Sequence, residues 1–368
     1  MRVILRRMIA VPTQCVRVRK GLALAGASAL LFAGCSSGTD SIAEREAPPT
    51  ESSSEPDVNI VATTTIWADI ASRSLCGLEV ASVIPAGADP HTFETSLADR
   101  ATLEQADLVV ANGLALEEGL VDLLATVADG GTPVIEMTEA VAIRDMGDDR
   151  DDEHSDDKDH ADEHHHEDED HGDEHADDED HDHDDKDHAD EHHHDHSGSD
   201  PHIWLDPINV ASTVNLITEA AIDAGFDSSV RACAQDFIGE IEALDTGIAD
   251  DLSAIPSDRR FLVTNHDALG YFAERYGFEV VGTVIPSLST LAETNPADLA
   301  DLAAIIEELD IPTVFSEEQA SARDADALAD AIPGLTVVAL DTGSLRDTDD
   351  DYLSMMRRNV TAIAEALG

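Results

Sequence analysis

The 49 residues 148–196 constrain the fold more than any other stretch of this chain. They include 27 Asp or Glu residues, 14 His residues and no large apolar side chain. A segment of this kind cannot bury enough apolar surface to offset the entropy lost on ordering, so we expect it to be disordered. The folded body must therefore be assembled from the residues before it and after it.

The same segment is dense in metal ligands, because imidazole and carboxylate groups bind borderline and hard divalent cations. The sequence Lys-Asp-His-Ala-Asp-Glu-His-His-His stands at 158–166 and again at 186–194. With no apolar face to stack, this repeat indicates a duplicated metal-binding tract and not a solenoid. The predicted accessory, low-affinity ligands are His154, His160, His164, His165, His166, His171, His175, His181, His183, His188, His192, His193, His194 and His196.

The acidic balance extends beyond this tract. The formal net charge is -58, and the mature chain outside the tract still has 52 acidic residues against 12 basic ones. Such a surface disfavours nucleic acid and anionic membrane as partners, and it attracts cations. A saline habitat would produce the same composition.

The N-terminus has the features of an export signal. Basic residues precede an apolar stretch that is too short to span a bilayer comfortably, and it ends in Leu-Phe-Ala-Gly-Cys at 31–35. This resembles a bacterial lipoprotein signal, which predicts a signal peptide at 1–34, lipidation of Cys35, a flexible tether at 35–57 and a location on the outer face of the cell membrane. An ordinary secretory signal is the alternative.

Two cysteines remain in the folded body, Cys76 and Cys233. An exported protein is exposed to oxidising conditions, so we predict that they form a disulfide. Two unrelated buried thiols are the alternative.

Hydrophobic periodicity predicts alternating strands and helices on both sides of the tract. Apolar residues spaced by three, four and seven positions predict a long helix at 228–255 between an N-terminal domain, 58–227 (the loop 148–199 included), and a C-terminal domain, 256–368. The expected strands are 58–62, 79–84, 107–113, 133–137, 260–264, 278–285, 313–315 and 336–340. The other expected helices are 66–75, one that is capped by Ser96 or Asp99 and runs through Gln105, 117–128, 207–224, 269–276, 296–309, 322–331 and 351–367.

Only three histidines lie outside the tract, and each belongs to a short motif. His91 stands in Asp-Pro-His-Thr-Phe-Glu, His202 in His-Ile-Trp, and His266 in His-Asp-Ala-Leu-Gly-Tyr-Phe, with Tyr-Gly at 276–277. With the His-rich insertion just before the second motif, the chain resembles the zinc and manganese solute-binding lipoproteins of ABC importers. The resemblance covers nearly all of 58–368.

The resemblance implies an α/β fold in which two α/β lobes with parallel sheets are joined by a single long rigid helix, with the metal site in the cleft between the lobes. The implied ligands are His91, His202, His266 and Asp341. Asp341 is assigned from its place after the last strand, and Glu317 or a water molecule is the alternative. The implied partner is an ABC permease with its ATPase, and the protein is expected to be a monomer and not an enzyme.

Three imidazoles with one carboxylate suit tetrahedral Zn²⁺, whereas Mn²⁺ prefers more oxygen ligands. Capture of zinc is therefore the leading hypothesis, and a manganese receptor of the same family is the alternative. A zinc hydrolase is a rival from another class, although the chain contains no His-Glu-x-x-His motif. A surface adhesin is the third hypothesis.

Overall fold

The computed structural model describes residues 58–145 and 198–368, which belong to one compact unit at 54–368. The predicted signal peptide, Cys35, the tether and the fourteen accessory histidines lie outside the described residues.

The N-terminal lobe is built on a parallel four-stranded sheet in the order β2-β1-β3-β4. Helix α1 begins at an N-cap, Thr64, whose side chain accepts a hydrogen bond from the Trp67 backbone, and α2 begins at a capping box formed by Ser96 and Asp99. The elements are β1 (Ile60–Ala62), α1 (Thr65–Ser74), β2 (Ala81–Ser82), α2 (Leu97–Glu104), β3 (Leu108–Ala111), α3 (Val121–Asp129), β4 (Val134–Glu136) and α4 (Pro207–Asp223), with short 3₁₀ turns before α3, after β4 and before α4.

The C-terminal lobe repeats this arrangement with a parallel sheet in the order β6-β5-β7-β8. Its elements are β5 (Phe261–Thr264), α6 (Gly270–Tyr276), β6 (Glu279–Thr283), α7 (Pro296–Glu308), β7 (Thr313–Glu317), α8 (Arg323–Ala331), β8 (Thr336–Leu340) and α9 (Tyr352–Leu367). Parallel sheets collect the loops that follow their strands at one edge, which is where open α/β sheets place ligands. The predicted fold class, two α/β lobes with parallel sheets, is confirmed.

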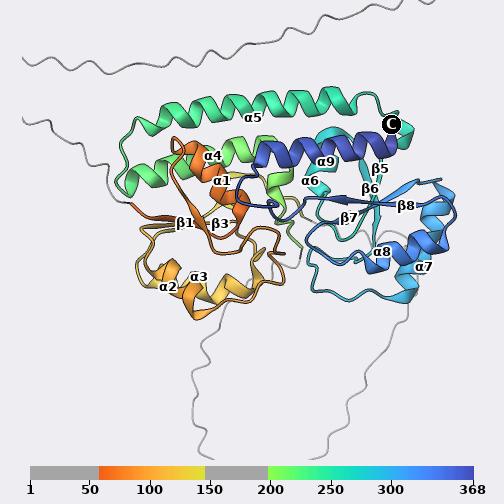
Figure 1. Ribbon diagram of the computed structural model, residues 1–368, viewed down its shortest axis with the longest axis horizontal. Helices are drawn as coiled ribbons and strands as arrows, with labels where there is room; N and C mark the ends of the chain where they lie inside the picture. The colour runs from red at the N-terminus through yellow and green to blue at the C-terminus, as the bar shows by residue number, and fades with distance from the viewer. Residues whose placement is uncertain (1–57, 146–197) are drawn as a thin grey trace, which may run out of the picture. The chain divides into compact units, whose positions relative to one another are not determined.

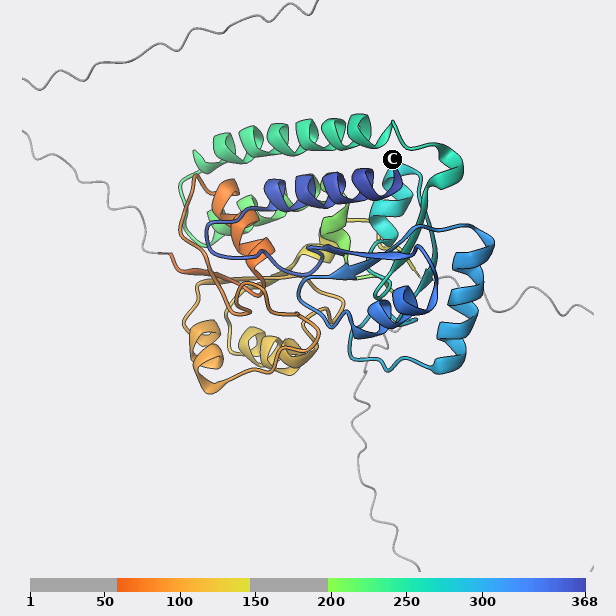
Figure 2. The ribbon, with the colours of Figure 1, turned by 45° about the vertical axis from the view of Figure 1, so that its right-hand side comes forward.

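The longest helix of the described chain, α5 (Val230–Leu252), connects the two lobes. It packs against α1 and α4 of the first lobe and against α9 of the second, and Figure 1 shows it extending above both sheets. Cys76, just after α1, and Cys233, in α5, form a disulfide. Figure 2 shows α9 lying beneath α5 along much of its length. The connection is therefore a packed helical layer and not a loose hinge.

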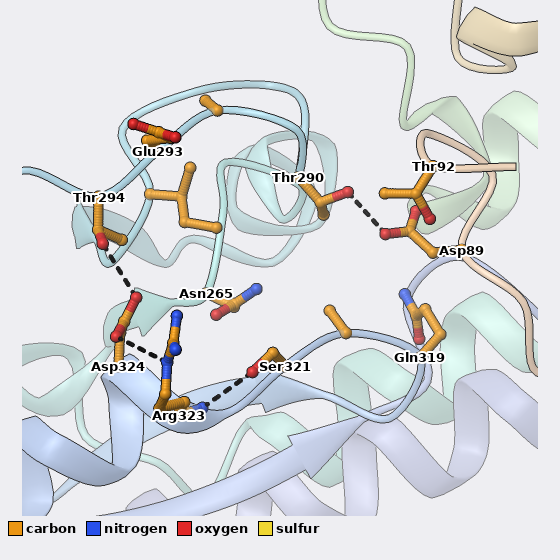
Figure 3. A pocket seen from close by; sticks show the side chains of 13 residues that line it. Asp89, Thr92, Asn265, Thr290, Glu293, Thr294, Gln319, Ser321, Arg323 and Asp324 are labelled. Carbon is orange, nitrogen blue, oxygen red and sulfur yellow. Dashed lines mark hydrogen bonds and ion pairs between the residues drawn. The ribbon is translucent and has the colours of Figure 1, made fainter.

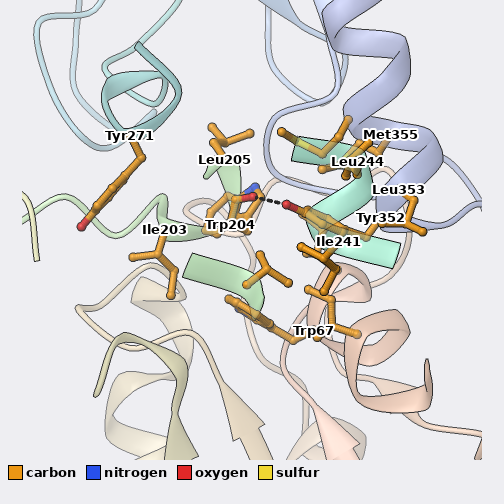
Figure 4. Packing of buried hydrophobic residues seen from close by; sticks show 14 of the residues in the cluster. Trp67, Ile203, Trp204, Leu205, Ile241, Leu244, Tyr271, Tyr352, Leu353 and Met355 are labelled. Atoms are coloured by element: carbon orange, nitrogen blue, oxygen red, sulfur yellow. Dashed lines mark hydrogen bonds between the residues drawn. The ribbon is translucent and has the colours of Figure 1, made fainter. Parts of the chain in front are cut away.

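The largest hydrophobic cluster belongs to both lobes. It includes Trp67 and Trp204 from the first lobe, Ile241 from α5, and Tyr271 and Tyr352 from the second. The Tyr352 hydroxyl donates a hydrogen bond of 2.8 Å to the Trp204 carbonyl at its centre (Figure 4). Each lobe also has a smaller cluster beside its sheet. Within the described ranges, no helix combines the length and the apolar character needed to cross a membrane.

Candidate metal centre

Three buried histidines from three separate loops converge on one point. His91 follows β2, His202 precedes α4 and His266 follows β5, and the three residues are 5%, 1% and 2% exposed. The Nε2 atom of His202 lies 3.3 Å from that of His91 and 3.1 Å from that of His266. Among the described residues, they form a group of possible ligand atoms that all lie within 4.8 Å of one another.

The tripeptide Asp-Pro-His shapes two of these loops in the same way. In each loop the Asp side chain accepts a 3.0 Å hydrogen bond from the backbone N–H of the histidine two residues later, Asp89 with His91 and Asp200 with His202. This is an Asx turn, and the proline between the two residues restricts its backbone further. The repeated motif therefore presents the two imidazoles on stiff local turns.

The far side of each ring faces a carboxylate. The Nδ1 atom of His202 lies 2.8 Å from Asp200 Oδ1, and Nδ1 of His266 is hydrogen-bonded to Glu317. His91 Nδ1 is 3.6 Å from Glu118 Oε1, which is beyond a direct hydrogen bond. The next residue, Gly119, packs directly against the loop that contains His91, since a Cβ atom there would lie 2.1 Å from the Phe93 carbonyl oxygen. Carboxylates in this position orient metal-binding histidines and set their tautomer.

These contacts decide where the lone pairs point. An ionised carboxylate only accepts hydrogen bonds, so Nδ1 carries the proton in His202 and His266, and each Nε2 presents a lone pair. Two lone pairs that face each other across 3.1 Å repel unless a cation or a proton lies between them. Ligand atoms around a tetrahedral ion with bonds of about 2.0 to 2.1 Å are about 3.3 Å apart. The geometry therefore fits a bound cation of the size of zinc.

The protonation equilibria of the rings differ. Burial, followed by the neighbouring His266 and His91, lowers the pKa of His202 well below its ordinary value, so this ring is neutral at neutral pH. Burial also lowers the pKa of His266, but the adjacent Glu317 carboxylate outweighs it and the net shift is upward. Burial raises the pKa of Asp200 to about 6, so Asp200 remains mainly ionised at pH 7. Because only the neutral ring binds a metal ion, protons compete with the metal at a higher pH for His266 than for His202.

The structure does not bring Asp341 to the three histidines. Its carboxylate, 2% exposed, forms ion pairs with Arg346 at 2.8 Å and with Arg358 at 3.0 Å. Glu317, the alternative, lies on the Nδ1 side of His266, where it also accepts a 3.1 Å hydrogen bond from Gln319. Among the described residues, the group of possible ligand atoms contains the three histidines and no carboxylate.

Contacts between the lobes close over the histidines. Thr290 of the second lobe donates a 2.6 Å hydrogen bond to Asp89, and Ser289 donates one to Glu118. Trp204 donates a 2.7 Å hydrogen bond across the lobes to the Thr342 carbonyl. These contacts hold the His91 and His202 loops against the second lobe.

A polar cavity of about 530 Å³ lies beside the histidines. Asp89 and Gln319 line both this cavity and the space between the histidine rings. Figure 3 shows Thr290 and Asp89 joined at one side of the cavity, and Asp324 and Arg323 at the other. The cavity therefore reaches the wall of the candidate metal centre.

The two ends of the His-rich insertion meet next to His202. Asp145 and Ser199 form an antiparallel bridge, and the Asp200 backbone N–H donates a 2.8 Å hydrogen bond to the Arg144 carbonyl. The Arg144 guanidinium lies 3.3 Å from Asp200 Oδ2. The described chain therefore stops and resumes within a few residues of a candidate ligand.

Sequence reasoning identified the histidines but not most of the groups that orient them. Asp200 stands two residues before His202, as Asp89 does before His91, and this spacing is a usable signal. Glu118, Arg346 and Arg358 carry no local signal, because their partners are distant in the sequence. Glu94, the last residue of the first motif, is exposed.

Comparison with known proteins places the chain in a family. The family profile described as "Zinc-uptake complex component A periplasmic" (ZnuA) matches residues 60–366. The manganese-binding lipoprotein MntA of Halalkalibacterium halodurans is 26% identical over 294 residues, which are 78% of this chain and 81% of that protein. The high-affinity zinc uptake system protein ZnuA of Bacillus subtilis is 27% identical over 295 residues, with 78% and 81% covered.

The structural comparison agrees on the fold. The periplasmic zinc-binding protein TroA from Treponema pallidum superposes with a TM-score of 0.66 and 23% identity, covering 84% of this chain and 99% of that one. Its sequence is 24% identical over 291 residues, 76% of this chain and 79% of the curated protein. Since the family profile spans most of the chain, the protein belongs to the ZnuA family of solute-binding proteins of zinc and manganese ABC importers.

Proposed function

We propose that this protein captures Zn²⁺ outside the cytoplasmic membrane and delivers it to an ABC permease for import. The observation that supports this most strongly is the group of three buried Nε2 atoms at 3.1 and 3.3 Å, at least two of which present lone pairs to a common point. His91, His202 and His266 are the ligands, and a water molecule completes the shell because Asp341 is engaged by arginines.

The choice of zinc over manganese follows from the chemistry of the donors. A site of imidazole nitrogens suits Zn²⁺, while Mn²⁺ favours carboxylate, carbonyl and water oxygens and a higher coordination number. The named relatives include both zinc-binding and manganese-binding proteins. The preference for zinc over manganese therefore rests on the three nitrogen ligands of this chain.

The tract 148–196 gathers zinc weakly near the centre, and its junction beside His202 supports this role. The acidic body adds a field that attracts cations. Lipidation at Cys35 would hold the protein, as a monomer, at the membrane that contains the permease.

The site favours a metal-binding role over a catalytic role. Three histidines and a water molecule also occur in catalytic zinc sites, but the space lined by the three rings is too small to admit a substrate beside the ion. A substrate could reach the ion only after the lobes separated.

Calorimetric titration of Zn²⁺ and Mn²⁺ into residues 54–368, with and without the tract 148–196, tests the proposal. We expect one tight zinc site that persists when the tract is deleted, that outcompetes manganese, and that is lost on substitution His202→Ala. Substitution of one histidine of the tract, His181→Ala, is the matched control and should leave the tight site unchanged. Tight binding that disappears with the tract but survives His202→Ala would assign the function to the tract instead.

A further inference from the structure

The Asp341 carboxylate, the fourth ligand expected from the sequence, is bound by arginines and does not belong to the group of possible ligand atoms formed by the three histidines. Its Oδ1 atom accepts a 2.8 Å hydrogen bond from Arg346 Nε, and its Oδ2 atom accepts one of 3.0 Å from Arg358 Nε. Both oxygens therefore have a charged partner, and such charge-assisted bonds are among the strongest in proteins.

The two arginines are themselves braced. Arg358 donates hydrogen bonds of 2.7 and 2.6 Å to the two oxygens of Asp350, and the Arg346 backbone N–H donates to the same carboxylate at 3.1 Å. Asn359 holds the Asp341 backbone through hydrogen bonds of 2.9 and 2.8 Å. The carboxylate is thus fixed by a network from α9 and from the loop before it.

The residues on either side of Asp341 in the chain lie close to the histidine site. In the paired strands β7 and β8, Leu340 lies opposite Glu317, whose side chain is bonded to His266. Thr342 and Gly343, the next two residues, line the space between the histidine rings. Asp341 instead lines a different cavity, of about 280 Å³, together with Arg346.

We propose that Arg346 and Arg358 are positioning residues that determine metal preference by withholding Asp341 from the metal centre. With Asp341 held away, the protein offers three nitrogen ligands and disfavours Mn²⁺, which requires oxygen ligands. Once released, the Asp341 carboxylate could turn toward the histidines and supply such an oxygen. This inference rests on the proposed zinc-binding function of the same site.

The test uses residues 54–368, the compact unit that contains all three hydrophobic clusters, in a chelator buffer that outcompetes the weak tract sites. The double variant Arg346→Gln/Arg358→Gln should improve manganese affinity relative to zinc affinity by about tenfold. Substitutions of groups that contact metal ligands typically change metal affinity by about this factor. The absorption spectrum of bound Co²⁺ should change as a carboxylate joins the shell. Arg323→Gln, at an exposed arginine paired with Asp324, is the matched control and should change neither.

The triple variant that adds Asp341→Asn should lose both the gain in manganese affinity and the spectral change. An unchanged metal preference in a folded double variant, or a gain that persists without the Asp341 carboxylate, overturns the inference.

If the double variant does not fold, Asp341→Asn in the otherwise unchanged chain decides the question. The zinc affinity of this variant should stay within about threefold of that of the unchanged protein. A loss of tenfold or more, as expected when support for a metal ligand is removed, would show that Asp341 already binds the ion. Absence of tight zinc binding in the unchanged protein would defeat the proposed function, and it is therefore distinguishable from failure of this inference.

Discussion

The disulfide between Cys76 and Cys233 should be a major source of stability. It closes a loop with a sequence separation of 157 residues. In the chain-entropy model, a loop of this length lowers the entropy of the unfolded chain enough to stabilise the folded protein by about 5 kcal/mol. Because a typical domain is stable by only about 5 to 15 kcal/mol, the double substitution Cys76→Ser/Cys233→Ser should remove a large part of the free energy of unfolding.

Urea unfolding followed by circular dichroism measures this loss. Cys76 is exposed and Cys233 is partly exposed, so serine at these positions disturbs little packing. The control is the single variant Ser212→Ala on the exposed face of α4, which should change stability by less than about 0.5 kcal/mol.

The same model also predicts how the stabilisation by the disulfide depends on the length of the closed loop. Deletion of the 49 residues 148–196 shortens the closed loop from 157 to about 108 residues. The contribution of the disulfide should then fall by only about 0.3 kcal/mol. A disulfide contribution below about 1 kcal/mol, or one that changes by several kcal/mol when the tract is deleted, would refute the reasoning.

Three further predictions concern the centre and the core. The pKa of His266 is raised and the metal binds the neutral ring, so zinc affinity should fall by about tenfold per pH unit below that pKa. Calorimetry in buffers of different ionisation enthalpy should detect the proton that His266 releases on zinc binding. The substitution Glu317→Gln should reduce this proton release near neutral pH. The substitution Thr290→Val removes the hydrogen bond to Asp89, a loss of about 1 kcal/mol. In stopped flow, zinc release to a chelator should therefore become about fivefold faster. An unchanged release rate would mean that this contact does not hold the lobes closed. Ile241→Ala, at a fully buried position of α5, should cost about 2 to 5 kcal/mol in urea unfolding while the zinc stoichiometry stays the same.

Much of the fold could be predicted because its signals are local. Hydrophobic periodicity located the helices and strands within a few residues of their observed ends, as the 228–255 prediction and the observed Val230–Leu252 illustrate. Differences occur mainly at ends: the strand expected at 79–84 is ordered as β2 only at Ala81–Ser82, and the helix expected from 117 begins with a 3₁₀ turn. End residues depend on caps and tertiary contacts that periodicity does not contain.

The sequence by itself determined which side chains could bind a metal and how two of them are presented. His91, His202 and His266 stand out because the folded body has no other histidine, and Asp-Pro-His forms its turn from adjacent residues. These features are encoded within a few positions of the chain, so no knowledge of distant contacts is needed.

Only the tertiary structure decided which carboxylates distant in the sequence serve those histidines. The alignment of β7 with β8 and the position of α9 place Glu317 on His266 and turn Asp341 toward Arg346 and Arg358. Glu317 is 51 residues from His266, and Arg358 is 17 residues from Asp341. Such pairings depend on how whole elements pack, and local sequence patterns do not specify that packing.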